Sequence, residues 1–202
     1  VGPVPESSVT NLGLVIVHRP TEDDHARALR NIGIVKSMTS ANMPMDARAA
    51  FDLSNAQVTT GNLEDADTTL RFAISLATND LDRYNYRLAR AYVLSQRAQY
   101  EPALQEAFAA VALVPELQDA YFFATEALFG MGRWAGAVEW YERGISRQPM
   151  LLSRDQPLMR HVQPRGQAAI SLLNMGEFER AQKLIDECVA VYPESALTKT
   201  LV

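Results

Sequence analysis

The sequence has one cysteine, no long hydrophobic run and no excess of positive charge. Cys188 has no partner for an internal disulfide, which is typical of a reducing compartment and predicts a cytoplasmic protein. The longest apolar run, Leu12–Val17, has the length of a strand and is far shorter than a membrane span, so we expect no membrane contact. A net charge of −5 argues against nucleic acid as a partner, because binding to phosphates requires a basic face. No basic and apolar leader is visible at the N-terminus, so no signal peptide is predicted.

The common catalytic motifs are also missing. There is no GxSxG, Walker or GxGxxG loop, no HExxH, and His18, His25 and His161 lie far apart in the sequence. Two DxD strings, at 65–67 and 80–82, resemble metal ligands, but both begin helical segments, where aspartate is favoured for capping and for the helix dipole. We therefore expect no catalytic residue and no cofactor in this chain.

What the sequence does contain is a repeat. The segment from Ala98 to Ala103 leads into a helix ending at Pro115, and the segment from Gly132 to Ala137 leads into a helix ending at Pro149, with every element offset by 34 residues. Weaker copies begin at 61 and 176, so the four copies are spaced by 37, 34 and 44 residues. The extra length before the last copy predicts an insert at 150–163.

Each position of the repeat has a physical role. Glycine at the turn allows positive φ, a large apolar residue two positions later begins the second helix, and a small residue allows two helices to cross closely. The large residues, which we expect to wedge between the paired helices, are Leu63, Tyr100, Trp134 and Phe178. The small residues are Ala66, Ala103, Ala137 and Ala181, and, seven positions further, Ala73, Ala110, Gly144 and Cys188.

This pattern resembles the tetratricopeptide-repeat (TPR) family over residues 45–193. The positions that carry the resemblance are Ala91, Ala103, Ala110 and Pro115 in one copy and Tyr121, Ala137, Tyr141 and Pro149 in the next. The resemblance implies an all-α, right-handed superhelix of helical hairpins that forms a domain over 45–202. It also implies a protein or peptide partner on the concave face, which the first helix of each hairpin lines.

Helical spacing assigns ten residues to that face. They are Asn85, Leu88, Tyr92, Gln96, Phe122, Glu126, Phe129, Ile170, Leu173 and Asn174. Phe122 and Phe129 are seven residues apart and would form one apolar strip; the alternative is that both rings fill the core or pack against the insert.

Residues 1–44 differ from the repeats. Leu12–Val17 predicts one short strand with no partner strand in the sequence, and a helix is expected from Thr21 to about Thr39. A lone strand cannot satisfy its own backbone hydrogen bonds, so it should pair with a missing part of the protein or with another chain.

The order of strand, His18, a helix with Arg30-Asn31 and helical hairpins resembles the end of the catalytic domain in some family-2 glycosyltransferases of the GT-A fold. The resemblance implies that His18 lies near a divalent metal and a nucleotide-sugar, both belonging to a catalytic domain before Val1. The chain would then be an interaction or oligomerisation module at the C-terminus of a glycosyltransferase. The alternative is a free-standing adaptor that binds a peptide or helix in its groove, and a structural homo-oligomer is a third possibility.

Overall fold

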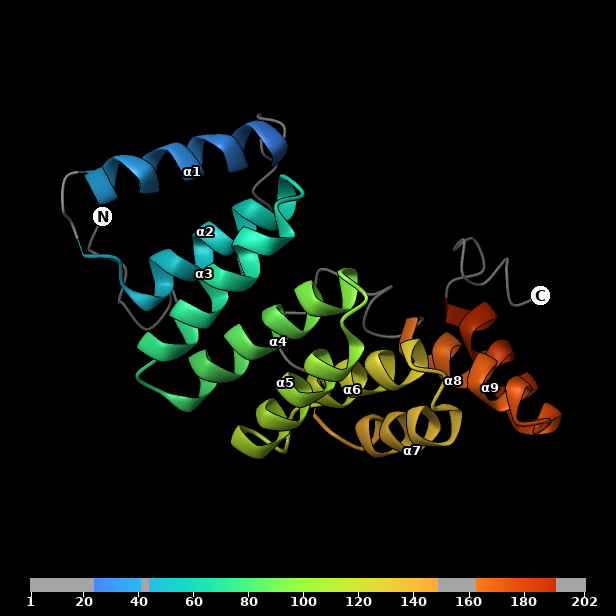
Figure 1. Cartoon of the computed structure of the whole chain (residues 1–202). Coiled ribbons are helices and arrows are strands. Elements are labelled where there is room, and N and C mark those ends of the chain that lie inside the picture. Colours follow the sequence, from blue (N-terminus) through green and yellow to red (C-terminus); the bar gives the residue numbers. More distant parts are fainter. Residues whose placement is uncertain (1–23, 41–43, 149–162, 192–202) are drawn as a thin grey trace, which may run out of the picture.

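The computed structural model describes residues 24–40, 44–148 and 163–191. These segments form helices joined by short turns, and the described residues contain no β-sheet (Figure 1). The expected N-terminal strand, at 12–17, lies outside them. The helices are α1 (Asp24–Ser40), α2 (Ala47–Thr59), α3 (Leu63–Leu76), α4 (Asp80–Gln96), α5 (Tyr100–Leu113), α6 (Asp119–Gly130), α7 (Trp134–Ile145), α8 (Gln163–Asn174) and α9 (Phe178–Val191).

Four antiparallel hairpins, α2–α3, α4–α5, α6–α7 and α8–α9, stack along the chain, and α1 packs against α2 (Figure 1). The first helices of the last three hairpins touch, because α4 contacts α6 and α6 contacts α8. The chain therefore has the expected all-α, TPR-like superhelix. Its helix starts follow the sequence signals: Asp46 accepts a hydrogen bond from the Ala49 amide at 2.7 Å and begins α2.

The turn inside each hairpin has one geometry. The residue two positions before the large apolar residue of the second helix has a positive φ. These residues are Gly61 (78°), Gly132 (69°), Gly176 (78°) and Ala98 (55°). The following amide then donates back to the end of the first helix, for example from Arg133 to the Leu128 carbonyl at 2.9 Å. Ala98 therefore adopts a conformation that suits glycine and disfavours a Cβ atom.

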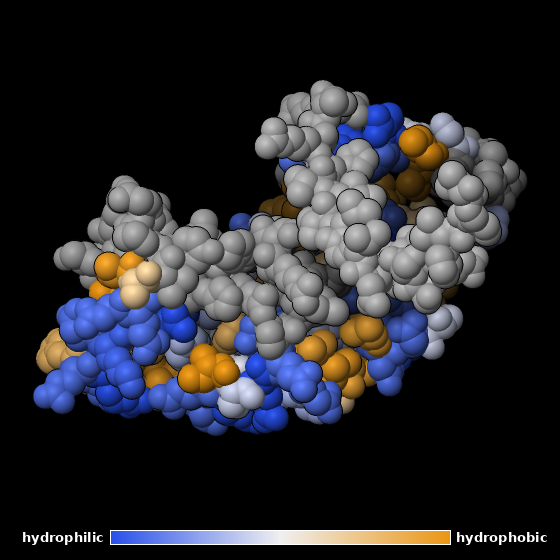
Figure 2. All heavy atoms as spheres, turned by 180° about the vertical axis from the view of Figure 1, so that it is seen from behind, coloured by the Kyte–Doolittle hydropathy of each residue, from blue (hydrophilic) through white to orange (hydrophobic). Residues whose placement is uncertain are grey.

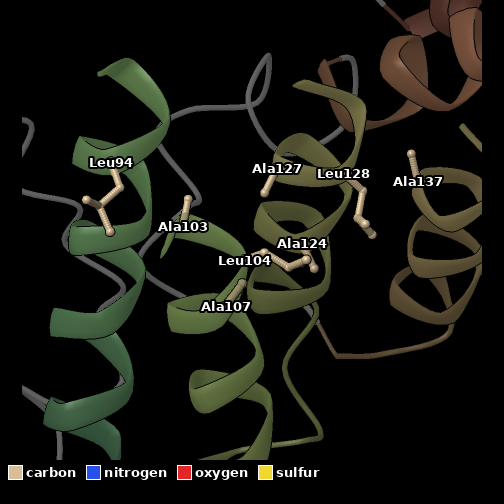
Figure 3. Close-up of a cluster of buried hydrophobic side chains, with 8 residues drawn as sticks. All are labelled: Leu94, Ala103, Leu104, Ala107, Ala124, Ala127, Leu128 and Ala137. Atoms are coloured by element: carbon tan, nitrogen blue, oxygen red, sulfur yellow. The ribbon is translucent and has the colours of Figure 1, made fainter. Parts of the chain in front are cut away.

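The small residues form the core, as expected from the repeat. Ala66, Ala103, Ala137 and Ala181 are fully buried. Around them one cluster joins the two middle hairpins, α4–α5 and α6–α7 (Figure 3). It contains Leu94, Ala103, Leu104, Ala107, Ala124, Ala127, Leu128 and Ala137.

The structure corrects the prediction that Phe178 wedges between the paired helices of the last hairpin. Phe178 is 67% exposed, whereas Leu63, Tyr100 and Trp134 are half-buried. The ring of Tyr100 lies against Gly130 at the end of α6, in the following hairpin. Phe178 belongs to the last described hairpin, and within the described part of the chain no later helix covers its ring.

Candidate functional site

The first helices of three consecutive hairpins enclose an open pocket of about 420 Å³. Helix α2 contributes its C-terminal half, α4 its middle and α6 one aromatic ring, with a single residue from α3 at the base. The lining residues are Ser54, Asn55, Val58, Thr59, Leu70, Leu88, Ala89, Tyr92 and Phe123. The pocket therefore has apolar walls with a few polar groups on the α2 side, which is the usual composition of a binding site for an apolar side chain.

The repeat explains which residues reach this face. Equivalent positions of consecutive first helices are Asn55, Tyr92, Glu126 and Ile170, since they are separated by the same spacings as the repeats. Asn55 and Tyr92 line one pocket, and α4 contacts α6 and α6 contacts α8, so these positions succeed one another along one face. The face changes along its length from an amide to a phenol, a carboxylate and an aliphatic side chain. We call the surface formed by the pocket and these positions the groove.

Glu126 is the charged residue of the groove. It lies one helical turn after the lining residue Phe123, so the two residues share a face of α6. Burial raises the pKa of its carboxyl group from 4.5 to about 7. No hydrogen bond or ion pair links this carboxylate to any described residue, in contrast to the carboxylates of Asp67 and Glu106. A half-buried acid without a partner is suited to a basic group from a ligand.

The structure brings only part of the predicted set together. Leu88 and Tyr92 line the pocket, and Glu126 lies on α6 one turn after the lining residue Phe123. Asn85 and Ile170 are half-buried, whereas Gln96, Leu173 and Asn174 are exposed. Asn174 uses its side-chain amide to donate to the Ile170 carbonyl at 2.9 Å.

Phe122 and Phe129 do not form a free apolar strip. The Phe122 ring stacks on Tyr141 with centroids 6.1 Å apart, and the Phe129 ring meets the edge of Trp134 at 5.5 Å. Both contacts lie inside the α6–α7 hairpin, so these rings fill the core, as the alternative interpretation stated. Phe123, one position later, is the ring that points into the groove region.

Sequence reasoning missed the α2 wall of the pocket. Subtracting the 37-residue spacing from Tyr92 leads to Asn55, so the repeat itself contained the signal. The same register relates Ala89 to Phe123, which both line the pocket. The prediction began the groove at the second hairpin, although α2 is the first helix of the hairpin before it.

A second polar cluster lies between α3, α4 and α5. The buried Asp67 carboxylate accepts from Arg90 at 2.7 Å and from Arg71 at 2.6 Å, and Arg97 lies 3.6 Å away. Glu106 accepts from Arg87 at 2.6 Å and also from Arg90, which joins the two acids into one network. Burial alone would raise the pKa of Asp67, but hydrogen bonds and charge from Arg90 and Arg71 outweigh it and lower that pKa.

This network corrects the interpretation of the first DxD string. Asp65 lies in the first turn of α3, as expected for the helix dipole, but Asp67 forms buried ion pairs instead. In the second string Asp80 and Asp82 lie in the first turn of α4, while the cap itself is Asn79, which accepts from the Asp82 amide at 2.8 Å. Neither string places two carboxylates together for a metal.

No group of three metal-binding side chains occurs among the residues that the structure describes. His18 lies outside them, so its predicted place near a metal stays a prediction. Cys188 is fully buried, and burial raises the pKa of its thiol, which favours the predicted packing role over a nucleophile. In the described ranges, no helix combines the length and apolar character needed to cross a bilayer.

The second helices of the first three hairpins each carry an exposed apolar residue. Phe72 is 46% exposed, Phe108 40% and Ile145 54%. On the face shown in Figure 2, hydrophobic side chains form separate small areas between hydrophilic ones. The groove is therefore the better candidate for a specific site.

No protein-family model matches the chain, and no curated protein matches it significantly in sequence. Several solved structures are similar to the chain in fold. One structure of MamA superposes with a TM-score of 0.64 at 17% identity, covering 85% of this chain and 95% of that one. MamA from Desulfovibrio magneticus RS-1 gives 0.60 at 14% identity, covering 88% and 99%. YrrB, described as a TPR protein with an unusual peptide-binding site, gives 0.59 at 17% identity, covering 86% and 90%. At these identities the similarity establishes the fold: the chain is built as a TPR superhelix.

Proposed function

We propose that this chain is a protein-interaction module whose groove binds an extended peptide segment of a partner protein. The observation that carries the proposal is the pocket shared by α2, α4 and α6. The buried carboxyl group of Glu126, which has no hydrogen-bond or ion-pair partner among the described residues, lies one turn after the lining residue Phe123. An apolar pocket supplies affinity, and a few polar groups at its edge supply orientation.

The chemistry of the groove defines the peptide. An aliphatic side chain would occupy the space between Val58, Leu88 and Phe123. A lysine or arginine a few residues away would pair with Glu126, and its charge would bring the raised pKa of that carboxyl group down again. The amide of Asn55 is exposed and can bond the backbone of an extended segment. The peptide-binding site described for YrrB supports this use of a TPR groove.

The test uses two fluorescent ten-residue peptides. Both contain two leucines two positions apart; one has lysine three positions after the second leucine, and the other has glutamine there. Fluorescence anisotropy should show tighter binding of the lysine peptide at pH 8. Because Glu126 must ionise to pair with lysine, and its pKa is raised to about 7, the affinity of the lysine peptide should rise about tenfold from pH 5.5 to 8. The glutamine peptide should show little change.

Three variants assign the binding to the groove. Tyr92→Glu should abolish binding of both peptides, because it places a charge in the pocket. Glu126→Gln should weaken only the lysine peptide and remove its pH dependence. Phe72→Glu, at an exposed position of α3, is the matched control and should bind as the wild type does. Equal binding to wild type and Tyr92→Glu would place the peptide elsewhere and contradict the proposal.

The glycosyltransferase role is a separate hypothesis, which rests on the resemblance around His18 and Arg30-Asn31. Arg30 and Asn31 lie on α1, while His18 is outside the described residues. The discriminating experiment adds a nucleotide-sugar with Mn²⁺ to the longer protein and to this chain. Stabilisation of the longer protein alone would support the role, and a reading frame without a nucleotide-sugar domain upstream of Val1 would remove it.

A further inference from the structure

We propose that the pocket between α2 and α4 selects an aromatic ring, the side chain of phenylalanine, over an aliphatic side chain of its peptide. The inference rests on the proposed function for the peptide and goes further by naming the side chain that fits the pocket best. It is carried by the way in which the repeat fills the corresponding place one hairpin later.

In the next hairpin, a ring of the protein itself fills this place. Advancing Ala89 by 34 residues leads to Phe123 on α6. The Phe123 ring packs against the cluster that contains Leu88 of α4, and also against the cluster shown in Figure 3. It therefore lies at the junction of α4 and α6, two first helices that contact each other.

At the junction of α2 and α4, the same position of the repeat has only a methyl group. Ala89 lines the pocket opposite Asn55 and Val58, which belong to α2. Among the described helices, α4 packs on α3, α5 and α6, whereas α2 does not pack on it as closely as α6 does. A methyl group where the next hairpin has a benzyl group leaves space for a ring, and we infer that the ligand supplies that ring.

The walls of the pocket suit an aromatic ligand. Tyr92 of α4 and Phe123 of α6 each contribute a ring to the lining. Aromatic rings that meet in offset or edge-to-face geometry stabilise each other beyond the effect of the area that they bury. One turn earlier, α2 and α4 already meet in this way, because the ring centroids of Phe51 and Tyr86 lie 4.8 Å apart. A phenylalanine ring from a peptide would extend this aromatic contact by one turn.

The hydroxyl groups of the pocket do not call for a polar ligand. Ser54 donates to the Phe51 carbonyl at 2.6 Å, and Thr59 donates to the Asn55 carbonyl at 2.9 Å. Both hydroxyl donors are thus used inside α2. The pocket therefore offers an apolar ligand a lining with its donors already satisfied, which favours phenylalanine over a polar side chain.

The first test compares three fluorescent peptides by anisotropy. One is the leucine–lysine peptide of the proposed function, and in the other two phenylalanine replaces either the first or the second leucine. At least one phenylalanine version should bind the wild type about fivefold more tightly than the leucine–lysine peptide does. Ala89→Phe should lose this preference, because its own ring fills the place, and Ala89→Leu should reduce it. Ala112→Phe, at an exposed position of α5, is the matched control and should keep it.

The second test needs no peptide. N-acetyl-phenylalaninamide and N-acetyl-leucinamide are titrated separately into the full chain, and NMR follows the methyl signals of Val58 and Leu88, which line the pocket. The ring current of a bound phenylalanine should shift these signals, and the leucine compound should shift them much less. In Ala89→Phe the added phenylalaninamide should cause no further shift. Circular dichroism checks that each variant is folded.

The two tests separate this inference from the proposed function. If the leucine–lysine peptide binds and neither phenylalanine version binds more tightly, the inference is wrong, although the proposed function stands. A preference that persists in Ala89→Phe would place the ring elsewhere and overturn the inference too. If no peptide binds, the proposed function fails for these peptides and the small compounds decide. Methyl shifts from phenylalaninamide that are absent in Ala89→Phe would support the ring site, whereas no shift, or equal shifts with both compounds, would overturn it.

Discussion

The ion-pair network between α3, α4 and α5 gives the sharpest prediction about stability, because the next hairpin contains its apolar counterpart. Advancing Arg87 and Glu106 by 34 residues leads to Tyr121 and Trp140, whose rings lie 5.5 Å apart. Advancing Arg90 leads to Ala124, and advancing Asp67 by the 37-residue spacing leads to Leu104, both in the apolar cluster of Figure 3. One location of the repeat is therefore filled with charges in one hairpin and with apolar groups in the next.

Removing one charge from the network should destabilise the protein strongly. Asp67→Asn leaves Arg90, whose side chain is 17% exposed, with one of its two carboxylate partners. Breaking a buried ion pair on one side costs about 3–5 kcal/mol, so we expect a loss of about 3 kcal/mol, since Glu106 still holds Arg90. Arg48→Ala, at an ion pair whose side chains are 75% and 52% exposed, is the control and should cost less than about 0.5 kcal/mol.

Replacing the two acids together with Arg87 and Arg90 should have the opposite outcome. The variant with Asp67→Leu, Arg87→Tyr, Arg90→Ala and Glu106→Trp copies the next hairpin. A well-packed apolar substitute for a buried ionic cluster is neutral or stabilising by about 1–4 kcal/mol. Urea denaturation followed by circular dichroism gives the free energy of unfolding of both variants, and an unchanged m-value supports two-state unfolding in each. A fourfold variant less stable than Asp67→Asn would refute the equivalence of the two sites.

The same network fixes the sign of a pH effect. The pKa of Asp67 is lowered in the folded protein, so its ion pairs add stability above its ordinary pKa of 3.8, and this stability is lost as the pH falls through the lower folded value. The difference in unfolding free energy between wild type and Asp67→Asn should therefore be constant near neutral pH and shrink below pH 3.8. A difference that stayed constant into strong acid would show that the carboxylate charge is not what stabilises the network.

Three further predictions concern close packing and turns, all measured as the free energy of unfolding in urea. Ala98→Gly should stabilise the protein by about 0.5–1 kcal/mol, because Ala98 has a φ of 55°, which glycine adopts without strain. Gly176→Ala should destabilise it by about 1 kcal/mol, because Gly176 has a φ of 78°, although there is open space around it. Equal effects of the two substitutions would contradict the positive φ angles of these turns. Gly144→Ala should cost about 1–3 kcal/mol, since the new Cβ would lie 2.9 Å from the Tyr121 Cβ, which the backbone fixes. Ala137→Leu should cost about 1–3 kcal/mol by overpacking a fully buried site, and an unchanged melting temperature would show that the face is assigned wrongly.

The repeat made most of the fold predictable, because its turn glycines and small residues satisfy local and steric requirements that can be read along the chain. It predicted the start of each second helix at Leu63, Tyr100, Trp134 and Phe178. It could not predict the network, since Arg87 and Arg90 in a helix are typical of a solvent face. Only the contact with Asp67, 23 residues earlier, makes Arg90 an interior residue.

The groove was less predictable than the fold for a related reason. Helical spacing identifies a face to within about one residue, and Phe122 and Phe123 are adjacent in the sequence. Gly144 explains why Phe122, and not Phe123, packs inside the hairpin. Because Gly144 has no side chain, there is room for the Phe122 ring, whose Cε1 lies 2.9 Å from where a Cβ would be. Phe122 therefore turns into the hairpin and Phe123 is left to line the pocket.

Stability and recognition consequently use different positions of the same repeat. At one position that holds the hairpins together, every copy has a fully buried alanine, as in Ala103 and Ala137, because a larger side chain would separate the helices. The groove positions vary from copy to copy, and they carry an amide, a phenol, a carboxylate and an aliphatic group in turn. Their order along the groove is thus free to encode a ligand. A partner that exchanged the order of its apolar and basic side chains would meet Glu126 with the wrong group and bind more weakly, although every packing contact of the superhelix stayed the same.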